Sequence, residues 1–149
     1  MKVRQANEAD VDAWLSLREA LWPDCGPQDQ LDEVRDQLAN PQLAAFVAEA
    51  PDGSLVGLLE ASIRPLAEGC EHHPVGYVEG WYVLPDWRRR GVGRALMAAA
   101  ESWAIDRGCR EMGSDIELHN TVSLSAHKAL GFAEAERLVH VVKRIGLDR

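Results

Sequence analysis

The sequence predicts a mixed α/β (α+β) domain, in which helices pack on one β-sheet. Segments with a helical hydrophobic period alternate with segments rich in β-branched and aromatic residues. Taken in order, these segments read β-α-α-β-β-β-α-β-α-β, which is typical of a mixed sheet covered by helices. The chain has 149 residues and shows no internal repeat, low-complexity tract or linker, so we expect a single domain over residues 1–149.

The N-terminal third predicts one strand and two helices. Residues 1–6 read as a strand, and Asn7 then caps a helix, with Asp10 as its capping-box partner. The first helix ends before Pro23 and is indicated by the spacing of Val11, Trp14, Leu15, Leu17, Leu21 and Trp22. We interpret residues 25–30 as a loop. A second, short helix follows through Leu31, Val34 and Leu38, closed by Asn40 and Pro41.

The middle of the chain predicts three strands. Residues 43–50 form the first, and the turn PDGS leads into alternating apolar residues from Leu55 to Ile63. A longer loop covers residues 65–74. The run VGYVEGWYVL, residues 75–84, is the longest aromatic and β-branched stretch, so we expect it at the centre of the sheet. Without a bulge, Tyr77, Glu79 and Trp81 share one face of that strand.

The C-terminal part predicts a helix, a strand, a helix and a final strand. The first helix ends near Gly108 and carries an apolar stripe of Val92, Leu96, Ala99 and Trp103. Residues 110–117 read as a short strand. Asn120 caps the next helix and Gly131 closes it. Residues 132–145 are predicted to form a final strand or strand pair.

Charge and composition narrow the classes of partner. The formal net charge of −8 argues against nucleic acid as the main partner and suits a small cationic ligand. No apolar run approaches the roughly 18 residues of a membrane span, and the N-terminus lacks the apolar stretch of a signal peptide, so we expect a cytoplasmic protein without a membrane partner. The cysteines Cys25, Cys70 and Cys109 lack metal-ligand spacing, and we expect neither a metal site nor a disulfide framework.

The stretch PDWRRRGVGRALM, residues 85–97, gathers arginines and glycines where the central strand meets a helix. The first turn of a helix exposes N–H groups without intrahelical partners, and glycines let a ligand approach them. The pattern Arg88-x-x-Gly91-x-Gly93 therefore predicts a diphosphate site. It is not a P-loop, because no Gly-Lys-Ser/Thr follows, and Leu96 replaces the third glycine of a Rossmann turn.

This pattern resembles the pyrophosphate loop of the GNAT superfamily of acetyl-CoA-dependent N-acetyltransferases, Gln/Arg-x-x-Gly-x-Gly/Ala. The stretch NTVSLSAHKALGF, residues 120–132, is similar to the helix that follows in that family. The resemblance implies the GNAT fold, a mixed and mostly antiparallel sheet with splayed central strands. More narrowly, the chain resembles bacterial aminoglycoside 6′-N-acetyltransferases in five segments: VRQANEADVDAWLSLREALWPD, ASIR, VEGWYVLPDWRRRGVGRALM, GCREMGSD and AEAERL.

The resemblance implies a role for particular residues. Backbone groups of Trp81, Tyr82 and Val83 would pair with the pantetheine arm of acetyl-CoA, and Asn120 would lie near it. The pyrophosphate would be held by Arg88, Arg89, Arg90, Gly91, Val92, Gly93 and Arg94. The acceptor pocket would be lined by Trp22, Glu79, Asp115 and Glu136. The family also implies a homodimer, and an acidic segment over residues 24–36 that borders the acceptor cleft.

Simpler roles exist for many of these residues. Trp22, Trp81 and Tyr82 could be core aromatics, the carboxylates surface charges, and Asn120 only a helix cap. An attacking amine must lose a proton, and Glu79 and Asp115 are equal candidates for the base. His127 stands where many relatives carry a tyrosine that protonates the departing thiolate, so a side-chain acid is in doubt.

Alternative functions are acetylation of a polyamine, an amino acid or a protein amine, and non-catalytic acyl-CoA binding.

Overall fold

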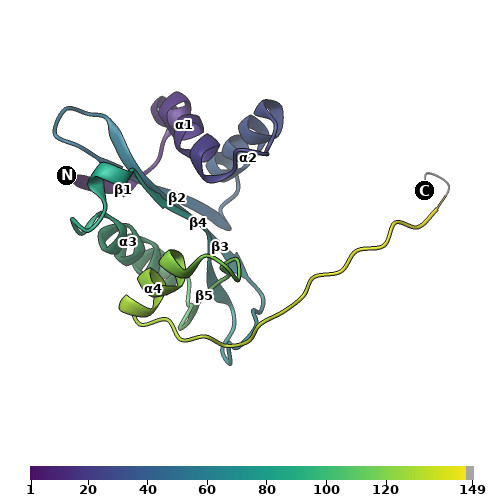
Figure 1. Ribbon diagram of the computed structural model, residues 1–149. Helices are drawn as coiled ribbons and strands as arrows, with labels where there is room; N and C mark the ends of the chain where they lie inside the picture. Colours follow the sequence, from purple (N-terminus) through teal and green to yellow (C-terminus); the bar gives the residue numbers. More distant parts are fainter. Residues whose placement is uncertain (147–149) are drawn as a thin grey trace. The chain divides into compact units, whose positions relative to one another are not determined.

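The computed structural model describes residues 1–146, and its centre is a five-stranded sheet in the order β1-β2-β3-β4-β5 (Figure 1). Strands β1 to β4 pair antiparallel with their neighbours, whereas β4 and β5 are parallel. This confirms the mixed, mostly antiparallel sheet. The strands are β1 (Lys2–Gln5), β2 (Leu43–Glu49), β3 (Leu55–Arg64), β4 (Val75–Val83) and β5 (Met112–Ser114).

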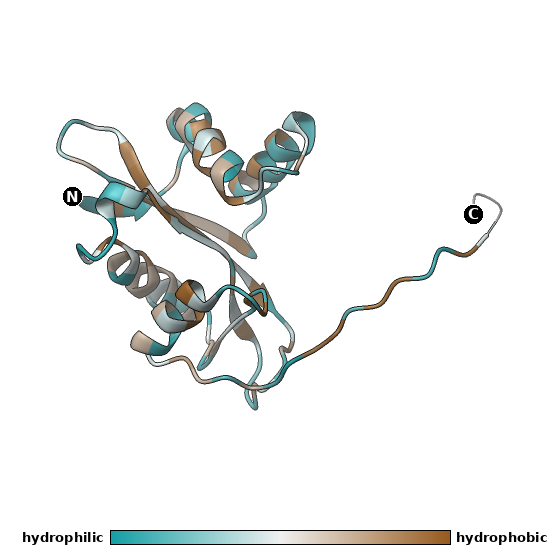
Figure 2. Ribbon diagram, in the orientation of Figure 1, coloured by the Kyte–Doolittle hydropathy of each residue, from teal (hydrophilic) through white to brown (hydrophobic). Residues whose placement is uncertain are grey.

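The chain forms two compact units, Met1–Asp115 and a second that begins at Ile116. Within the first unit, α1 (Val11–Leu21) and α2 (Pro27–Ala39) cover one face of the sheet, and α3 (Val92–Asp106) covers the other (Figure 1). The sheet between them is largely hydrophobic (Figure 2). The core on the side of α1 and α2 contains Trp14, Leu17, Val34, Val47 and Leu58. That all 149 residues act as a single domain stays a prediction.

Local sequence signals account for the ends of these helices. Asn7 and Asp10 form the expected capping box before α1, with Asn7 N donating to Asp10 Oδ2 at 2.8 Å. The interpretation of residues 25–30 as a loop was wrong over its last four residues, because α2 begins at Pro27. Proline is favoured at the first position of a helix, where its missing N–H has no intrahelical partner in any case.

A β-bulge in β4 re-aims the side chains of the central strand. Glu60 pairs with Gly80 and Ala61 with Val78, so Glu79 is an extra residue on β4. Glu79 and Gly80 consequently both face α1, and a Cβ on Gly80 would lie 2.5 Å from the Trp22 ring. Trp81 faces α3 instead, where its ring packs on Gly93. The sequence alone predicted that Trp81 shares a face with Tyr77 and Glu79, but the bulge places Trp81 on the opposite face.

Strands β4 and β5 diverge after a short pairing. The parallel ladder joins only Gly76–Val78 to Met112–Ser114. Beyond Val78, no strand of the described chain pairs with β4 on that side. This is the splayed arrangement that the family resemblance implies, and it leaves main-chain groups of β4 without a neighbouring strand.

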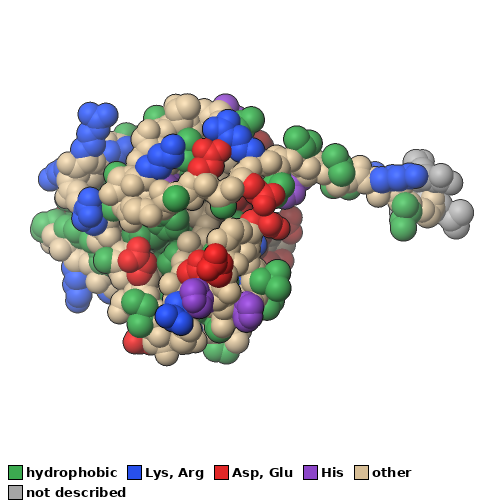
Figure 3. Space-filling view, turned by 90° about the horizontal axis from the view of Figure 1, so that it is seen from below, with side chains coloured by type: hydrophobic (Ala, Val, Ile, Leu, Met, Phe, Trp, Pro, Cys, Tyr) green, Lys and Arg blue, Asp and Glu red, His purple; other side chains and the backbone are tan. Residues whose placement is uncertain are grey.

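The second unit contains α4 (Thr121–Ala129), which Asn120 caps by accepting a hydrogen bond from Ser123 N at 3.0 Å. Gly131 closes it with a φ of 96°, as expected. The final strand over residues 132–145 was wrong, because residues 132–145 form no helix or strand. A strand needs hydrogen bonds from a neighbour, which a single extended segment lacks. Its large hydrophobic side chains are 54–94% exposed: Leu138, Val139, Val141, Val142 and Ile145. Figure 2 colours stretches of this segment as hydrophobic, and Figure 3 shows hydrophobic side chains on its surface.

Candidate functional site

The turn between β4 and α3 has the shape of an anion site. Gly91 is the N-cap of α3 and adopts a φ of 83°, and Arg89, before it, has a φ of 60°. No side chain caps this helix, and the first helical bond of this turn runs from Ala95 N to Gly91 O at 3.0 Å. The N–H groups of the first turn are therefore available to a ligand. Four exposed arginines lie in or next to this turn in the sequence: Arg88, Arg89, Arg90 and Arg94.

The two glycines of this turn serve different ends. A Cβ on Gly91 would meet no atom within 4 Å, so Gly91 is required by its positive φ. A Cβ on Gly93 would lie 3.0 Å from the Trp81 ring, so Gly93 also allows that indole to pack against α3. The buried side chain of Val92 anchors the start of the helix in the core. Sequence reasoning gave both glycines to the ligand and missed the packing role of Gly93.

Main-chain groups of β4 face the gap between β4 and β5. Leu84 N donates to Val56 O at 2.9 Å, so its N–H points toward β3. Because N–H directions alternate along a strand, Trp81 and Val83 direct theirs away from β3, and Tyr82 directs its own toward β3. The carbonyl of Val83 accepts a hydrogen bond from Arg88 Nε at 2.9 Å. The N–H of Val83 thus points into the gap, whereas that of Tyr82 points toward β3; the expected roles of Trp81, Tyr82 and Val83 toward the pantetheine arm stay predictions.

A cavity of about 460 Å³ lies against the sheet face that α1 and α2 cover. Arg18 is the one basic residue in its lining, and the acidic residues outnumber it. Such a wall attracts a cationic ligand. The lining residues are Arg18, Trp22, Asp24, Cys25, Glu33, Asp36, Gln37, Leu43, Glu60 and Glu79.

Glu79, on the bulge, is bound by two neighbouring side chains. Arg64 Nη2 lies 2.9 Å from both carboxylate oxygens of Glu79, and Arg64 Nε lies 3.1 Å from Oε2. Ser62 Oγ donates to Oε2 at 2.5 Å. The guanidinium also stacks on Tyr77, with Cζ 3.5 Å from the ring centroid. Glu79 is therefore an anion whose charge is already compensated.

Asp115, the second candidate base, has a different environment. It is exposed, and its Oδ2 accepts a hydrogen bond from the phenol of Tyr77 at 2.7 Å. Burial, followed by the hydrogen bond to Asp115, raises the pKa of Tyr77, so the phenol stays protonated and remains a donor. Tyr77 and Arg64 thus link Asp115 to Glu79 through side-chain contacts. Of the two carboxylates, Glu79 lines the cavity and Asp115 does not, and their roles toward the acceptor stay predictions.

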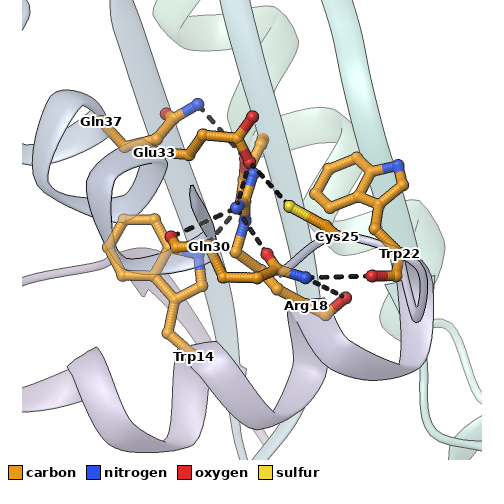
Figure 4. A network of polar contacts seen from close by, with 8 residues as sticks. Trp14, Arg18, Trp22, Cys25, Gln30, Glu33 and Gln37 are labelled. Atoms are coloured by element: carbon orange, nitrogen blue, oxygen red, sulfur yellow. Dashed lines mark hydrogen bonds and ion pairs between the residues drawn. The ribbon is translucent and has the colours of Figure 1, made fainter. Parts of the chain in front are cut away.

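Trp22 follows α1 and packs over Gly80, next to Glu79. Beneath it lies a buried polar network around Arg18 and Glu60, with Arg18 Nε 2.8 Å from Glu60 Oε2 (Figure 4). Sequence reasoning missed this network, since its two ions are 42 residues apart. The one available signal was a glutamate in an otherwise apolar strand, because a charge at such a place needs a partner.

The other candidate residues belong to the second unit. Asn120 acts as the cap of α4, and its role near acetyl-CoA stays a prediction. Glu136 is exposed and lies outside any strand, so its expected place at the start of a strand was wrong. His127 is 4% exposed; its Nδ1 lies 2.7 Å from Ser123 O and its ring packs edge-on against Phe132. A carbonyl oxygen only accepts, so Nδ1 carries a proton.

The chain is similar to known acetyltransferase sequences over most of its length. The sequence model of the Acetyltransferase (GNAT) family matches residues 11–132. A relative from Stenotrophomonas maltophilia, named aminoglycoside N(6′)-acetyltransferase type 1, is 47% identical over 139 residues, 93% of this chain and 90% of the relative. A relative of the same name from Salmonella typhimurium is 43% identical over 97% of this chain and 99% of its own.

Two solved structures resemble this chain over nearly its whole length. AAC(6′)-Iy, in complex with the bisubstrate analogue CoA-S-monomethyl-acetylneamine, superposes with a TM-score of 0.93 at 41% identity, over 97% of this chain and 98% of the other. The apo aminoglycoside 6′-N-acetyltransferase AAC(6′)-IG from Acinetobacter haemolyticus has a TM-score of 0.92 at 39% identity, over 98% and 100% of the two chains. In this protein, no helix of residues 1–146 is long and apolar enough to span a bilayer.

Proposed function

The chain belongs to the acetyltransferase (GNAT) family, and on that premise we propose that it transfers the acetyl group of acetyl-CoA to the 6′-amine of an aminoglycoside. The observation that carries this function is the combination of an acidic cavity on the sheet face beneath α1 and α2 with an uncapped, arginine-rich first turn of α3. The first fits a polycationic acceptor and the second a diphosphate. The relatives over nearly the whole chain carry the same activity in their names.

Acetyl-CoA fits the turn before α3 and the gap beside β4. The free N–H groups at Val92, Gly93 and Arg94 and the arginine side chains would hold its pyrophosphate. Main-chain groups of Trp81 and Val83 would bind the pantetheine arm. The bound cosubstrate supplies an acetyl thioester, which is activated toward attack by an amine. The N–H of Val83 would donate to the negative charge that develops on the thioester oxygen.

The acceptor fits the cavity lined by Trp22 and Glu79. Its ammonium groups would pair with carboxylates of the wall, and one would exchange with Arg64 for Glu79. The attacking amine must be neutral, so a group near it has to accept a proton. Asp115 suits this role better than Glu79. Tyr77 donates to only one oxygen of Asp115, Oδ2, whereas Arg64 binds both oxygens of Glu79. The proton would thus pass to Asp115, directly or through water. As the new C–N bond forms, the C–S bond of the thioester would break, and CoA would leave as its thiolate.

We further propose a homodimer. The segment of residues 138–145 is rich in β-branched residues, exposes its large hydrophobic side chains and forms no strand in a single chain. A second copy could supply the missing strand partner. Light scattering should give twice the monomer mass, and a chain shortened to residue 133 should give the monomer mass; a monomeric full-length protein contradicts the proposal.

A CoA-release assay with a panel of amines tests the function and its alternatives together. Thiol release should require an aminoglycoside with a 6′-amine, and an otherwise identical compound with a 6′-hydroxyl should give none. Release with polyamines, amino acids or peptides alone would favour a different acceptor, and tight acetyl-CoA binding without release would favour a binding module. A cytoplasmic location, the absence of a metal and the absence of a nucleic-acid partner stay predictions.

A further inference from the structure

The buried centre of the cavity wall is an ion pair between Arg18 and Glu60. Arg18 is 4% exposed and is held by Glu60, which is 1% exposed. Arg18 Nε lies 2.8 Å from Glu60 Oε2, and Nη2 lies 3.1 Å from Oε1. Trp14 Nε1 and Gln37 Nε2 donate to the same carboxylate, at 2.9 and 3.3 Å (Figure 4). Protein donors thus occupy both oxygens of Glu60, which anchors Arg18 to β3.

The other side of the guanidinium reaches groups that border the cavity. Arg18 Nη1 donates to Gln30 Oε1 and to Glu33 Oε2, each at 2.7 Å. Gln30 Nε2 donates in turn to the backbone oxygen of Trp22 at 3.0 Å. The Arg18 guanidinium lies 4.6 Å from the centroid of the Trp22 ring. Arg18 therefore fixes both the indole and a carboxylate while it is itself fixed to the sheet (Figure 4).

Arg18 stays charged in this buried place and holds the exposed Glu33 side chain. Burial alone would lower the pKa of Arg18, but the hydrogen bonds and charges of Glu60 and Glu33 outweigh it and raise the pKa. The Glu33 side chain is 56% exposed and would sample many rotamers without this contact. The contact occupies Oε2 only, and Oε1 makes no hydrogen bond within residues 1–146. A carboxylate with one available oxygen is thus held at the wall.

We propose that Arg18 is a positioning residue of the acceptor pocket, and that Glu33, which it orients, binds an ammonium group of the acceptor. This inference rests on the proposed function, because it requires a polycationic acceptor in the cavity. An aminoglycoside carries several ammonium groups at fixed spacing. A carboxylate held in one position, with Trp22 fixed beside it, selects acceptors by that spacing.

The test compares Glu33→Gln with Glu19→Gln. The control removes the same charge from an exposed residue next to Arg18 that does not line the cavity. Glu33→Gln should raise KM for neamine about tenfold, as for the loss of a charged hydrogen bond. Its kcat and its KM for acetyl-CoA should stay near those of the wild type, and Glu19→Gln should leave all three unchanged.

Arg18→Lys tests the positioning role. Lysine keeps a charge for Glu60 but lacks the planar fork that reaches Glu33 and stacks on Trp22. We expect a similar rise in KM for neamine with little change in kcat. Because Arg18 acts through Glu33, the double variant should show a smaller rise than the product of the two single effects.

Equal KM values for neamine in Glu33→Gln and Glu19→Gln would overturn the inference, whether or not Arg18→Lys folds. Multiplicative effects in the double variant would overturn the positioning role. Titration calorimetry with neamine makes the same comparison without turnover. A wild-type protein that binds neamine but acetylates no amine contradicts the proposed function alone, and one that neither binds nor acetylates contradicts both proposals.

Discussion

Arg64 and Glu79 form a two-point ion pair in the sheet face beneath α1 and α2, with Arg64 Nη2 2.9 Å from each oxygen of Glu79. The carboxylate is compensated before an acceptor arrives. Because both of its oxygens are already hydrogen-bonded, we assign Glu79 to binding an ammonium group in exchange for Arg64. Glu79→Gln should raise the acceptor KM about tenfold with kcat nearly unchanged, the pattern of a lost binding contact. A fall in kcat at unchanged KM would instead make Glu79 the base.

Asp115→Asn should act on the chemical step. Removal of the proposed base lowers kcat about 10²-fold, at the lower end of the range for lost acid–base help, while acetyl-CoA affinity stays intact. Tyr77→Phe, which keeps the carboxylate and removes its hydrogen-bond donor, should cost less. Steady-state kinetics across pH provide the measurement. If Asp115→Asn keeps the kcat and the pH–rate profile of the wild type, the proton passes to solvent.

The anion site can be tested at Gly91, where a Cβ meets no other atom but φ is positive. Asn and Asp tolerate this conformation better than other side chains do, and they are nearly equal in size. Gly91→Asp should abolish measurable CoA binding in calorimetry, because it puts a negative charge at the helix start, whereas Gly91→Asn should keep most of it. Equal affinities of the two folded variants would disprove the pyrophosphate site at this turn.

The fold depends on the buried pair of Arg18 and Glu60. Glu60→Gln leaves a buried guanidinium whose other anionic partner within residues 1–146, Glu33, is exposed, and should lower the free energy of unfolding by about 3–5 kcal/mol. Urea denaturation at pH 7 measures this, with Glu19→Gln as the exposed control. A loss below about 1 kcal/mol, the usual worth of a surface pair, would show that water reaches the pair.

Acid stability should depend on Asp10. The hydrogen bond from Arg4 lowers the pKa of Asp10 below its ordinary value of 3.8, so the unfolded chain binds the proton more readily than the folded one. Its contribution is present above about pH 4 and is lost as the pH falls through the folded value. Asp10→Asn should therefore cost more stability at pH 7 than at pH 3 in urea unfolding. A cost that does not change with pH would assign Asp10 a role in capping alone.

Much of the fold follows from local sequence signals. Three local patterns predicted their elements correctly: the capping box at Asn7, the apolar stripe of α3 from Val92 to Trp103, and the aromatic run of β4. Each pattern is formed by residues that are close in the sequence. The prediction of a loop over residues 25–30 was wrong from Pro27 on, because this proline begins a helix, whereas a proline such as Pro23 indicates the end of one. The prediction of a strand over residues 132–145 was wrong because a strand needs a hydrogen-bonded neighbour, and no strand within residues 1–146 pairs with this segment.

The site was harder to predict, since its geometry depends on distant residues. The bulge at Glu79 turns Trp81 to the opposite face, and no local pattern encodes it, because the extra residue is defined by pairing with Glu60 and Ala61. The Arg18–Glu60 pair joins a helix to a strand 42 residues away. The family resemblance pointed to Trp22 and Asp115 as site residues. Only the structure shows that Trp22 packs on Gly80 and that Asp115 accepts a hydrogen bond from Tyr77.

The most direct measurement of the central claim is the identity of the acetylated product. Neamine incubated with acetyl-CoA and the enzyme should gain one acetyl group, and NMR should place it on the 6′-nitrogen. The 6′-hydroxyl analogue should gain none. Acetylation at another nitrogen, or no acetylation of neamine by a folded enzyme that binds CoA, would contradict the assignment.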